Sequence, residues 1–283
     1  MNKQDVNIIH ISASDLESPY FDRGFLYGES IYDVIPFYGK KPYSVLDHYL
    51  RFSRDAKLMK MPFTLSLEDF EAVIDTAIGN VNFADGSVYL QITSGNYGSR
   101  FIMPLRDEQA TIIALAFESI RPTISCLLGG VKLVLFPENR GSYCHVKSTN
   151  RLSTRLAMLH AKDHGATESI WYEQSTGLIH EGCSSNIFFI ADHHLITPAL
   201  SPYIFPGLAR EKILSLAEQL GVVAICRDIF IDELRHFQGA FITGCTKQLV
   251  PVKQLEQAYY SIHPLWATMF KAYNDHIDLA LSG

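Results

Sequence analysis

The stretch LIHEGCSSNIFFI, residues 178–190, joins a short turn rich in Gly and Ser to an apolar run. Gly and Ser are typical turn residues, and the run Asn186–Ile190 has the length and composition of a buried strand. By itself, Glu181 would be an ordinary acid in a turn exposed to water. The stretch therefore predicts an acidic side chain shortly before a buried strand.

A lysine stands upstream of this turn, in ENRGSYCHVKSTNRLS (138–153). Lys147 lies just ahead of an expected helix that Thr149 or Asn150 could cap. A single lysine in such a place is usually a solvated charge. Alone, the residue predicts no chemistry.

Downstream, SPYIFPGLAREKI (201–213) runs a Pro-Gly loop directly into a helix. The first backbone N–H groups of a helix have no partner within it, and those near Leu208 and Ala209 could bind an anion. An ordinary loop-to-helix junction is the commoner explanation. This segment also needs support from elsewhere in the chain.

Runs of β-branched and aromatic residues alternate with helical spacings in the first part of the chain. Val45, Tyr49, Phe52 and Ala56 recur at helical spacing, and Ser66 with Asp69 predicts a capped helix start. We expect strands at 7–11, 31–37, 87–93 and 111–117. This part is predicted to be an α+β domain, residues 1–118, followed by a linker over 119–130.

The second part, residues 131–283, is predicted to form the larger domain. One helix presents Leu152, Leu156 and Leu159 on a single face, and another runs from Ala209 to Leu220. Strands are expected at 131–135, 168–172, 186–190, 223–227 and 240–243.

Composition excludes several classes of protein. The 283 residues are 47% hydrophobic and 19% charged, as in ordinary globular chains, and the net charge of -6 predicts no basic stripe for nucleic acid. No apolar run approaches the roughly 20 residues that span a membrane. The N-terminus MNKQDVNIIH lacks a signal-peptide pattern, so we expect a cytoplasmic protein.

Metal and disulfide chemistry have little support in the sequence. The five cysteines are dispersed and form no CxxC pair, which predicts reduced thiols. His193 and His194 have no further ligand at metal-binding spacing, so we expect turn residues and no metal. The motifs of P-loop NTPases, zinc proteases and α/β-hydrolases are also absent.

Taken together, the motifs resemble the pyridoxal-phosphate (PLP) enzymes of fold type IV. This family includes D-amino acid aminotransferase, branched-chain aminotransferase and aminodeoxychorismate lyase. The matching segments, in order, are DRGFLYGESIYDV (22–34), LDHYLRF (46–52), EGCSSNIFFI (181–190) and ITGCTKQLVPV (242–252). The resemblance implies a two-domain α/β fold with a smaller N-terminal and a larger C-terminal domain.

The resemblance also implies the cofactor and its partners. PLP reacts as an aldehyde and needs a lysine amine that holds it as a Schiff base and then moves the substrate α-proton, a role that falls to Lys147. Glu181 matches the carboxylate that keeps the pyridine nitrogen protonated. Arg51 matches the family's phosphate arginine, with the amides of Leu208 and Ala209 completing the phosphate cup.

Other residues near the cofactor follow from the same likeness. Arg140 matches an arginine that D-amino acid aminotransferases place near the phenolate oxygen of PLP. Ser184, Ser185 and Asn186 are expected to orient Glu181 and to form hydrogen bonds around the cofactor.

One loop departs from the family pattern. Where a hydroxyl donor is usual on the phosphate side, this chain has Gly244 followed by Cys245 and only then Thr246. Either Cys245 contributes its backbone N–H alone or Thr246 supplies the hydroxyl. A thiol is a poor donor, so weaker cofactor binding is expected.

The substrate side departs further. In D-amino acid aminotransferases a tyrosine and an Arg-x-His pair on a loop of the neighbouring subunit hold the substrate carboxylate. Tyr32 matches the tyrosine, whereas QITSGNYGSRFIMP (91–104) places Arg100 one residue out of register and lacks the His. A loop can absorb that shift, so Arg100 stays a candidate carboxylate ligand.

We therefore expect a PLP-dependent aminotransferase that moves an amino group between a D-amino acid and a 2-oxo acid by a ping-pong cycle. The wording Tyr-Asp-Val after Ile31 favours this branch. A branched-chain L-amino acid aminotransferase, an aminodeoxychorismate lyase and a PLP-free binding protein remain alternatives. The resemblance also implies a homodimer whose active site includes the subunit interface.

Overall fold

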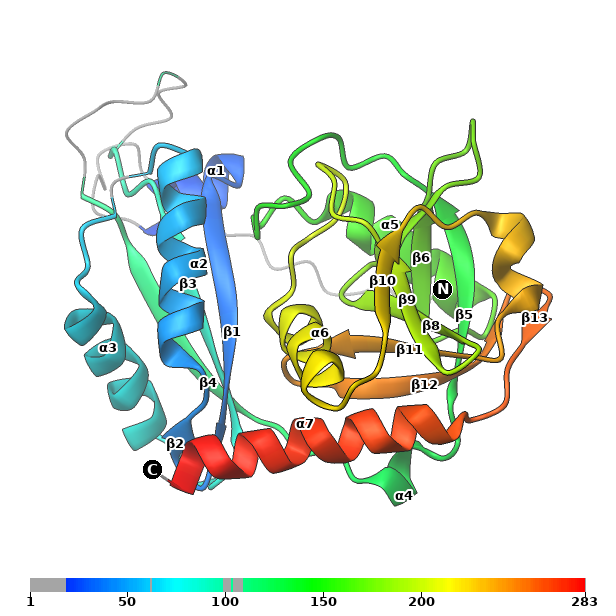
Figure 1. The fold of residues 1–283 in the computed structure, drawn as a ribbon. Helices are drawn as coiled ribbons and strands as arrows, with labels where there is room; N and C mark the ends of the chain where they lie inside the picture. The colour runs from blue at the N-terminus through cyan, green and yellow to red at the C-terminus, as the bar shows by residue number, and fades with distance from the viewer. Residues whose placement is uncertain (1–18, 62, 99–102, 104–108, 283) are drawn as a thin grey trace, which may run out of the picture.

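The computed structural model describes residues 19–61, 63–98, 103 and 109–282, and it places two β-sheets side by side. The smaller sheet and its helices form one half, and the larger, curled sheet forms the other (Figure 1). The long helix α7 (Pro264–Ser282) runs beneath both halves. The space between the sheets is where the candidate site lies.

The smaller sheet is antiparallel, with the order β2-β1-β3-β4. Helices α2 and α3 cover one of its faces, and their apolar sides form a core with β1, β3 and β4. Ser66 and Asp69 form the predicted capping box, with Asp69 N donating to Ser66 Oγ at 3.1 Å. The elements are η1 (Pro19–Phe21), α1 (Arg23–Tyr27), β1 (Ser30–Tyr38), β2 (Lys41–Pro42), α2 (Val45–Leu58), α3 (Leu67–Gly79), β3 (Gly86–Thr93) and β4 (Ile112–Glu118).

The larger sheet is mixed, with the order β10-β9-β8-β11-β12-β5-β6-β7, and β13 pairs with β12. It curls, so that Ile179 N at the start of β7 donates to Ile229 O beyond β10 at 2.8 Å. Its strands are β5 (Val131–Pro137), β6 (Glu168–Tyr172), β7 (Ile179–Gly182), β8 (Asn186–Ala191), β9 (His194–Pro198), β10 (Ala224–Arg227), β11 (Gly239–Gly244), β12 (Gln248–Leu255) and β13 (Ala258–Tyr259). The helices of this half are α5 (Leu152–Asp163), α6 (Leu208–Gln219) and α7, with the short η2 (Ile231–His236).

Helix α7 joins the two halves. Trp266, Met269 and Phe270 are buried in a core shared with α6 and the larger sheet. Near its other end, Arg121 donates to Asn274 Oδ1 at 2.8 Å, and Lys41 Nζ donates to Leu281 O at 2.7 Å. One helix thus ties the connection after β4 and the β1–β2 hairpin to the larger sheet.

Most predicted elements are confirmed in the described residues, but several predictions need correction. The expected strand at 7–11 lies outside the described residues, and the 119–130 connection contains one short helix, α4 (Ile124–Leu127). The predicted cap of α5 is wrong, since Arg151 occupies the N-cap position and no side chain caps the helix. The leucine face of α5 is exposed, while Ala157 and Ala161 face the core. Helix α7 and the strands β7, β9 and β12 were not predicted from the sequence, and His194 belongs to β9 instead of a turn.

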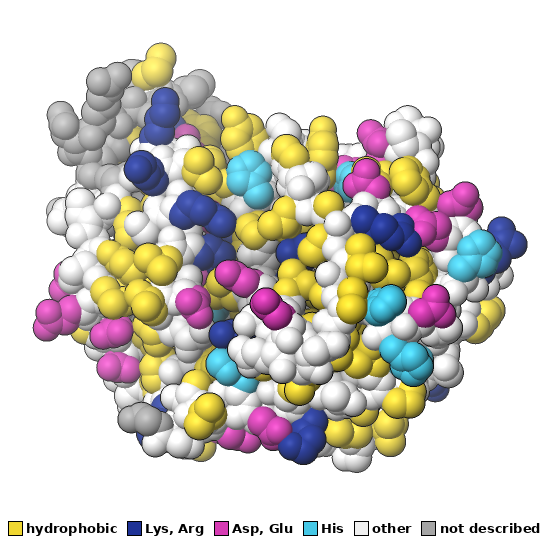
Figure 2. Space-filling model, in the orientation of Figure 1, with side chains coloured by type: hydrophobic (Ala, Val, Ile, Leu, Met, Phe, Trp, Pro, Cys, Tyr) yellow, Lys and Arg dark blue, Asp and Glu magenta, His cyan; other side chains and the backbone are white. Residues whose placement is uncertain are grey.

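Surface and cysteine properties agree with composition. On the face drawn in Figure 2, Lys and Arg side chains occur together with Asp and Glu side chains. All five cysteines are free thiols, as predicted. None of the helices in the described ranges has the length and apolar character needed to cross a bilayer.

Candidate active site

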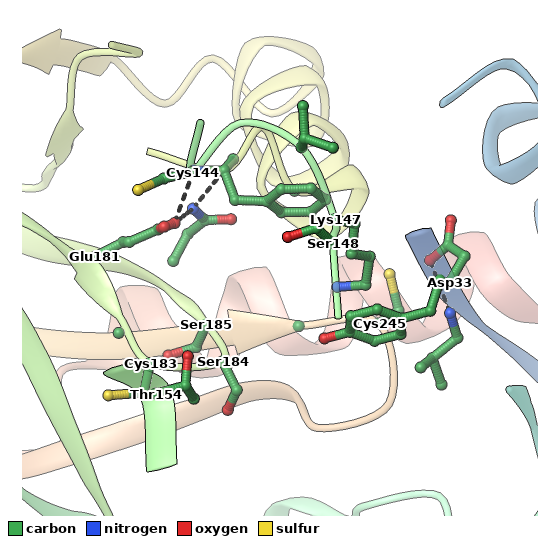
Figure 3. A pocket seen from close by; sticks show the side chains of 18 of the residues that line it. Asp33, Cys144, Lys147, Ser148, Thr154, Glu181, Cys183, Ser184, Ser185 and Cys245 are labelled. Carbon is green, nitrogen blue, oxygen red and sulfur yellow. Dashed lines mark hydrogen bonds between the residues drawn. The ribbon is translucent and has the colours of Figure 1, made fainter. Parts of the chain in front are cut away.

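A cavity of about 480 Å³ lies between the two sheets. In Figure 3, Glu181 and Asp33 lie on opposite sides of it, and the Lys147 amine points into the space between them. All but one of the residues singled out from the sequence line this cavity: Tyr32, Arg51, Arg140, Lys147, Glu181, Ser184, Ser185, Asn186, Leu208, Ala209, Gly244, Cys245 and Thr246. The exception, Arg100, lies outside the described residues.

Lys147 is anchored through its backbone. Its N–H donates to Asp55 Oδ2 on α2 at 3.0 Å, and its carbonyl accepts from Tyr32 N on β1 at 2.9 Å. Nζ lies 5.0 Å from the centre of the Tyr32 ring and 4.6 Å from that of Phe205. Within the part of the chain that the structure describes, no carboxylate forms an ion pair with this amine. It is therefore free to react.

Glu181, at the end of β7, is buried and held by three donors. Arg140 Nη1 donates to Oε1 at 2.8 Å, while Phe205 N and Asn186 Nδ2 each donate to Oε2 at 3.0 Å. Burial raises the pKa of Glu181 to about 7, although Arg140 and the other donors oppose the rise. A carboxyl group with such a pKa can share a proton with a weakly basic nitrogen near neutral pH.

Arg140 is held in a network of acids and is not a solvated surface residue. Its guanidinium donates to Glu138 Oε2 at 2.6 Å and to Tyr203 O at 2.9 Å, besides its contact with Glu181. Partial burial of Glu138 would raise its pKa, but contacts with His180 and Arg140 lower that pKa to about 2. The cation is therefore matched by nearby negative charge.

The prediction that Ser184 and Ser185 orient Glu181 is wrong. Both bind Glu168, with Ser184 N at 2.5 Å and Ser185 Oγ at 3.0 Å from Oε1. Lys247 Nζ donates to Oε2 of the same buried carboxylate at 2.8 Å. The turn carries two networks, because Ser184 and Ser185 bind Glu168 whereas Asn186 binds Glu181. Little in the sequence signals Glu168, since its partner Lys247 is far along the chain.

Arg51, on α2, is paired to an acid that the sequence analysis missed. Its Nη2 donates to Asp33 Oδ1 at 2.6 Å and its Nε donates to Oδ2 at 3.1 Å, and His48 Nδ1 lies 3.1 Å from Oδ2. Burial would raise the pKa of Asp33, but Arg51 and then His48 hold it well below its usual range. Burial would lower the pKa of His48, yet Asp33 raises it to about 9.

The N-terminus of α6 opens onto the cavity. Gly207 is its N-cap in an extended conformation and offers no side chain to the first helical N–H groups. A Cβ at this position would lie 2.2 Å from Asn186 Oδ1, so only glycine allows the approach. Leu208 and Ala209 line the cavity, and no side chain caps the start of their helix, as a site for an anion requires.

The turn after β11 faces the same end of the cavity. Gly244, Cys245 and Thr246 line it, and the buried Thr243 Oγ1 has no hydrogen-bond partner among the described residues. Burial would raise the pKa of the Cys245 thiol, but His48 and then Arg51 lower it. A dianion placed here would meet backbone amides, the Thr243 hydroxyl and the cations His48 and Arg51.

The comparisons with known proteins identify the family. The family model of class IV aminotransferases matches residues 30–255, so the chain belongs to this family. The D-alanine aminotransferase of Staphylococcus aureus (strain MW2) is 28% identical over 256 residues, which cover 90% of each chain.

Two solved structures show the same fold. A branched-chain amino acid aminotransferase of Escherichia coli has a TM-score of 0.81 at 22% identity and covers 90% of this chain and 87% of its own. A protein of Legionella pneumophila described as a 4-amino-4-deoxychorismate lyase has a TM-score of 0.81 at 22% identity, covering 90% and 93%. The fold is therefore that of the two-domain PLP enzymes of fold type IV.

Class IV aminotransferases depend on PLP, and a branched-chain aminotransferase with this fold is complexed with N-(5'-phosphopyridoxyl)-L-glutamate. The cavity fits this cofactor. The aldehyde of PLP needs an amine, and Lys147 offers one that has no ion-pair partner among the described residues. The ring nitrogen needs a carboxyl group such as the buried Glu181, whose pKa is raised, and the phosphate needs anion-binding donors such as those at the start of α6 and Thr243. None of these features alone is specific for PLP, but the combination of all three in one cavity is.

Proposed function

We propose that this class IV enzyme is a D-amino acid aminotransferase that transfers an amino group to a 2-oxo acid by a ping-pong cycle. One observation carries the proposal: the Lys147 amine, which has no described ion-pair partner, shares a cavity with the buried Glu181 carboxyl, whose pKa is raised to about 7. The preference for D-amino acids is supported by the likeness to D-alanine aminotransferases and by Tyr32 in the cavity wall.

In this proposal the residues divide the chemistry among them. PLP, when bound, supplies an electron sink next to the substrate α-carbon. Lys147 Nζ would accept the proton from that carbon and would then donate it to a different carbon, the one that carries the aldehyde in free PLP, so one amine would serve as general base and general acid. Glu181 shares a proton with the pyridine nitrogen, while Arg140 and Asn186 fix the carboxyl in place. Arg140 is also proposed to face the phenolate oxygen.

The phosphate end is proposed to hold the cofactor without taking part in proton transfer. Arg51, the amides of Leu208 and Ala209, and the turn of Gly244 and Cys245 would bind the phosphate. Since Asp33 already accepts two hydrogen bonds from Arg51, the guanidinium is held in one orientation before the phosphate arrives. Ser185 and Asn186 would line the ring.

The half-reaction with amino acids tests the proposal. Purified holoenzyme is mixed separately with D-alanine, D-glutamate, L-leucine and L-glutamate, and the conversion of PLP to pyridoxamine phosphate is followed by absorbance. Conversion by the D-isomers alone is expected. Conversion by the L-isomers alone would replace the proposal with a branched-chain L-amino acid aminotransferase.

An aminodeoxychorismate lyase is the second alternative, because the Legionella protein with this description shares the fold. A lyase releases its product without consuming a 2-oxo acid. Turnover of aminodeoxychorismate in the absence of 2-oxoglutarate would favour it over any aminotransferase. Dependence on 2-oxoglutarate is the expected result.

We also propose a homodimer, as the resemblance implies. The outward row of β4, Ile113, Leu115 and Phe117, is exposed although its neighbours in sequence pack into the core. The leucine face of α5 is likewise exposed, with Leu156 47% accessible. Apolar rows of this kind fit a subunit interface. Light scattering should give about twice the chain mass of 31.9 kDa. The cytoplasmic location and the role of Arg100 stay predictions of the sequence.

A further inference from the structure

The cations of the cavity differ in their partners. Arg51 binds Asp33, Arg140 binds Glu138 and Glu181, and Lys247 binds Glu168. Arg151 also lines the cavity, but no described carboxylate contacts it. Among the described residues, Arg151 is therefore the arginine of this cavity whose charge is not balanced by a carboxylate.

The Arg151 side chain is positioned with donors to spare. Its Nη1 donates to the Tyr32 hydroxyl at 2.5 Å and its Nη2 donates to Cys183 O at 3.2 Å. A guanidinium has five N–H groups, so further donors remain for a ligand. Because the Tyr32 oxygen accepts from Arg151, its own proton is free to be donated. The two side chains form a pair of adjacent donors, one of them charged.

This donor pair lies near the reactive amine. Arg151 Cζ lies 5.7 Å and Lys147 Nζ lies 5.0 Å from the centre of the Tyr32 ring. The ring is itself fixed by stacking on Tyr89, with centres 5.4 Å apart. In an α-amino acid the carboxylate is attached to the carbon that bears the amino group. A carboxylate bound here would therefore keep that carbon close to Lys147.

We propose that Arg151, together with the Tyr32 hydroxyl, binds the α-carboxylate of the substrate and so selects α-amino acids and 2-oxo acids over simple amines. The inference rests on the proposed function and deepens it. It assigns the carboxylate to an arginine four residues after Lys147 on the same chain, whereas the sequence pointed to Arg100. Two parallel, charge-assisted hydrogen bonds from a guanidinium to a carboxylate give both affinity and orientation.

Substrate comparison with matched variants tests this role. R151Q removes the charge, R151K keeps the charge but loses the fork, and R155Q removes an exposed arginine one turn along α5 as the control. Each holoenzyme is assayed in the half-reaction with D-alanine, or with L-alanine if that isomer reacts, and with ethylamine, which is alanine without its carboxylate.

The expected result distinguishes a role of Arg151 in binding the substrate carboxylate from a purely structural role. R151Q should raise the KM for alanine by about 10- to 100-fold, with R151K between it and the wild type. It should keep bound PLP, and the ratio of kcat/KM for alanine to kcat/KM for ethylamine should fall by about 10- to 100-fold relative to that of R155Q. An alanine KM within twofold of that of R155Q would overturn the inference. So would an equal loss with both substrates, since Arg151 would then only bridge Tyr32 and Cys183.

Binding of propionate to the holoenzymes keeps this inference separate from the proposed function. If the wild type converts no amino acid, the proposed aminotransferase function fails. The Arg151 site is still tested by the dissociation constant for propionate. Loss of propionate affinity in R151Q but not in R155Q supports the carboxylate site, and equal affinity in both variants overturns it.

Discussion

The two ends of the cavity differ in how completely their polar groups are paired. At the Glu181 end, the carboxyl accepts from Arg140, Asn186 and a backbone amide, and Arg140 is in turn bound by Glu138. Around Lys147, in the space between Glu181 and Asp33, two cations, Lys147 and Arg151, have no carboxylate partner among the described residues. A saturated network suits a resident cofactor, while unpaired donors suit a ligand that enters and leaves in each cycle.

Replacing Lys147 with alanine should give the largest effect. We expect turnover to fall by at least about 10⁴-fold, because the variant loses both the covalent attachment of PLP and the proton carrier. Since Nζ has no ion pair with a described residue, the thermal midpoint of the cofactor-free variant should stay near that of the cofactor-free wild type. Turnover and the midpoint are compared with those of K162A, an exposed lysine on α5. Near-native turnover would rule out the role.

Replacing Glu181 with glutamine tests the region of the cavity around Glu181, where the polar groups are paired. Turnover should slow by about 100-fold, because an amide cannot hold the pyridine nitrogen protonated. Bound PLP, measured by absorbance per subunit, should persist, since the phosphate end is untouched. An unchanged kcat would remove Glu181 from the mechanism, and loss of PLP would make its role structural.

The same residue gives a prediction for the pH dependence of stability. In the cofactor-free protein, folding raises the pKa of Glu181 from 4.5 to about 7, so the folded state binds this proton more tightly than the unfolded state. Stability should therefore fall as pH rises from about 4.5 to 7, by up to about 3 kcal/mol. E181Q should lack this decrease when unfolding by urea is measured at each pH. Parallel curves for the two proteins would contradict the raised pKa.

The smallest expected effect concerns Cys245. Replacing it with threonine supplies a hydroxyl donor and removes a thiol whose pKa is lowered, so PLP should bind about 3- to 10-fold more tightly. The dissociation constant of PLP is measured beside that of C126T, whose cysteine is exposed. Weaker binding of PLP to C245T would contradict this expectation and would mean that the cavity needs the Cys245 sulfur atom at this position.

Local patterns predicted most of the fold. The strand at 186–190 and the helix that Ser66 and Asp69 start were predicted correctly because their signals lie within a few residues. The helix over 264–282 was missed, although Trp266, Phe270 and Tyr273 recur at helical spacing. The periodicity that predicts this helix is therefore present in the sequence.

The site could be predicted only in part, for a physical reason. Motif positions located Lys147, Glu181 and Arg140, which do share one cavity. The pairing of Glu168 with Lys247 joins residues 79 positions apart, and no local pattern reveals it. The leucine face of α5 illustrates another limit, because spacing shows that a face is apolar but not what covers it.

The anchoring of Lys147 has a consequence for the way the site is assembled. Its backbone is held by Asp55 of α2 and Tyr32 of β1, although the residue follows the 119–130 connection in the chain. The proposed reactive amine is therefore placed by the opposite half of the molecule. Fragments cut within that connection should each lack a positioned lysine and should regain activity only on association. Activity would then report how completely the two halves have docked.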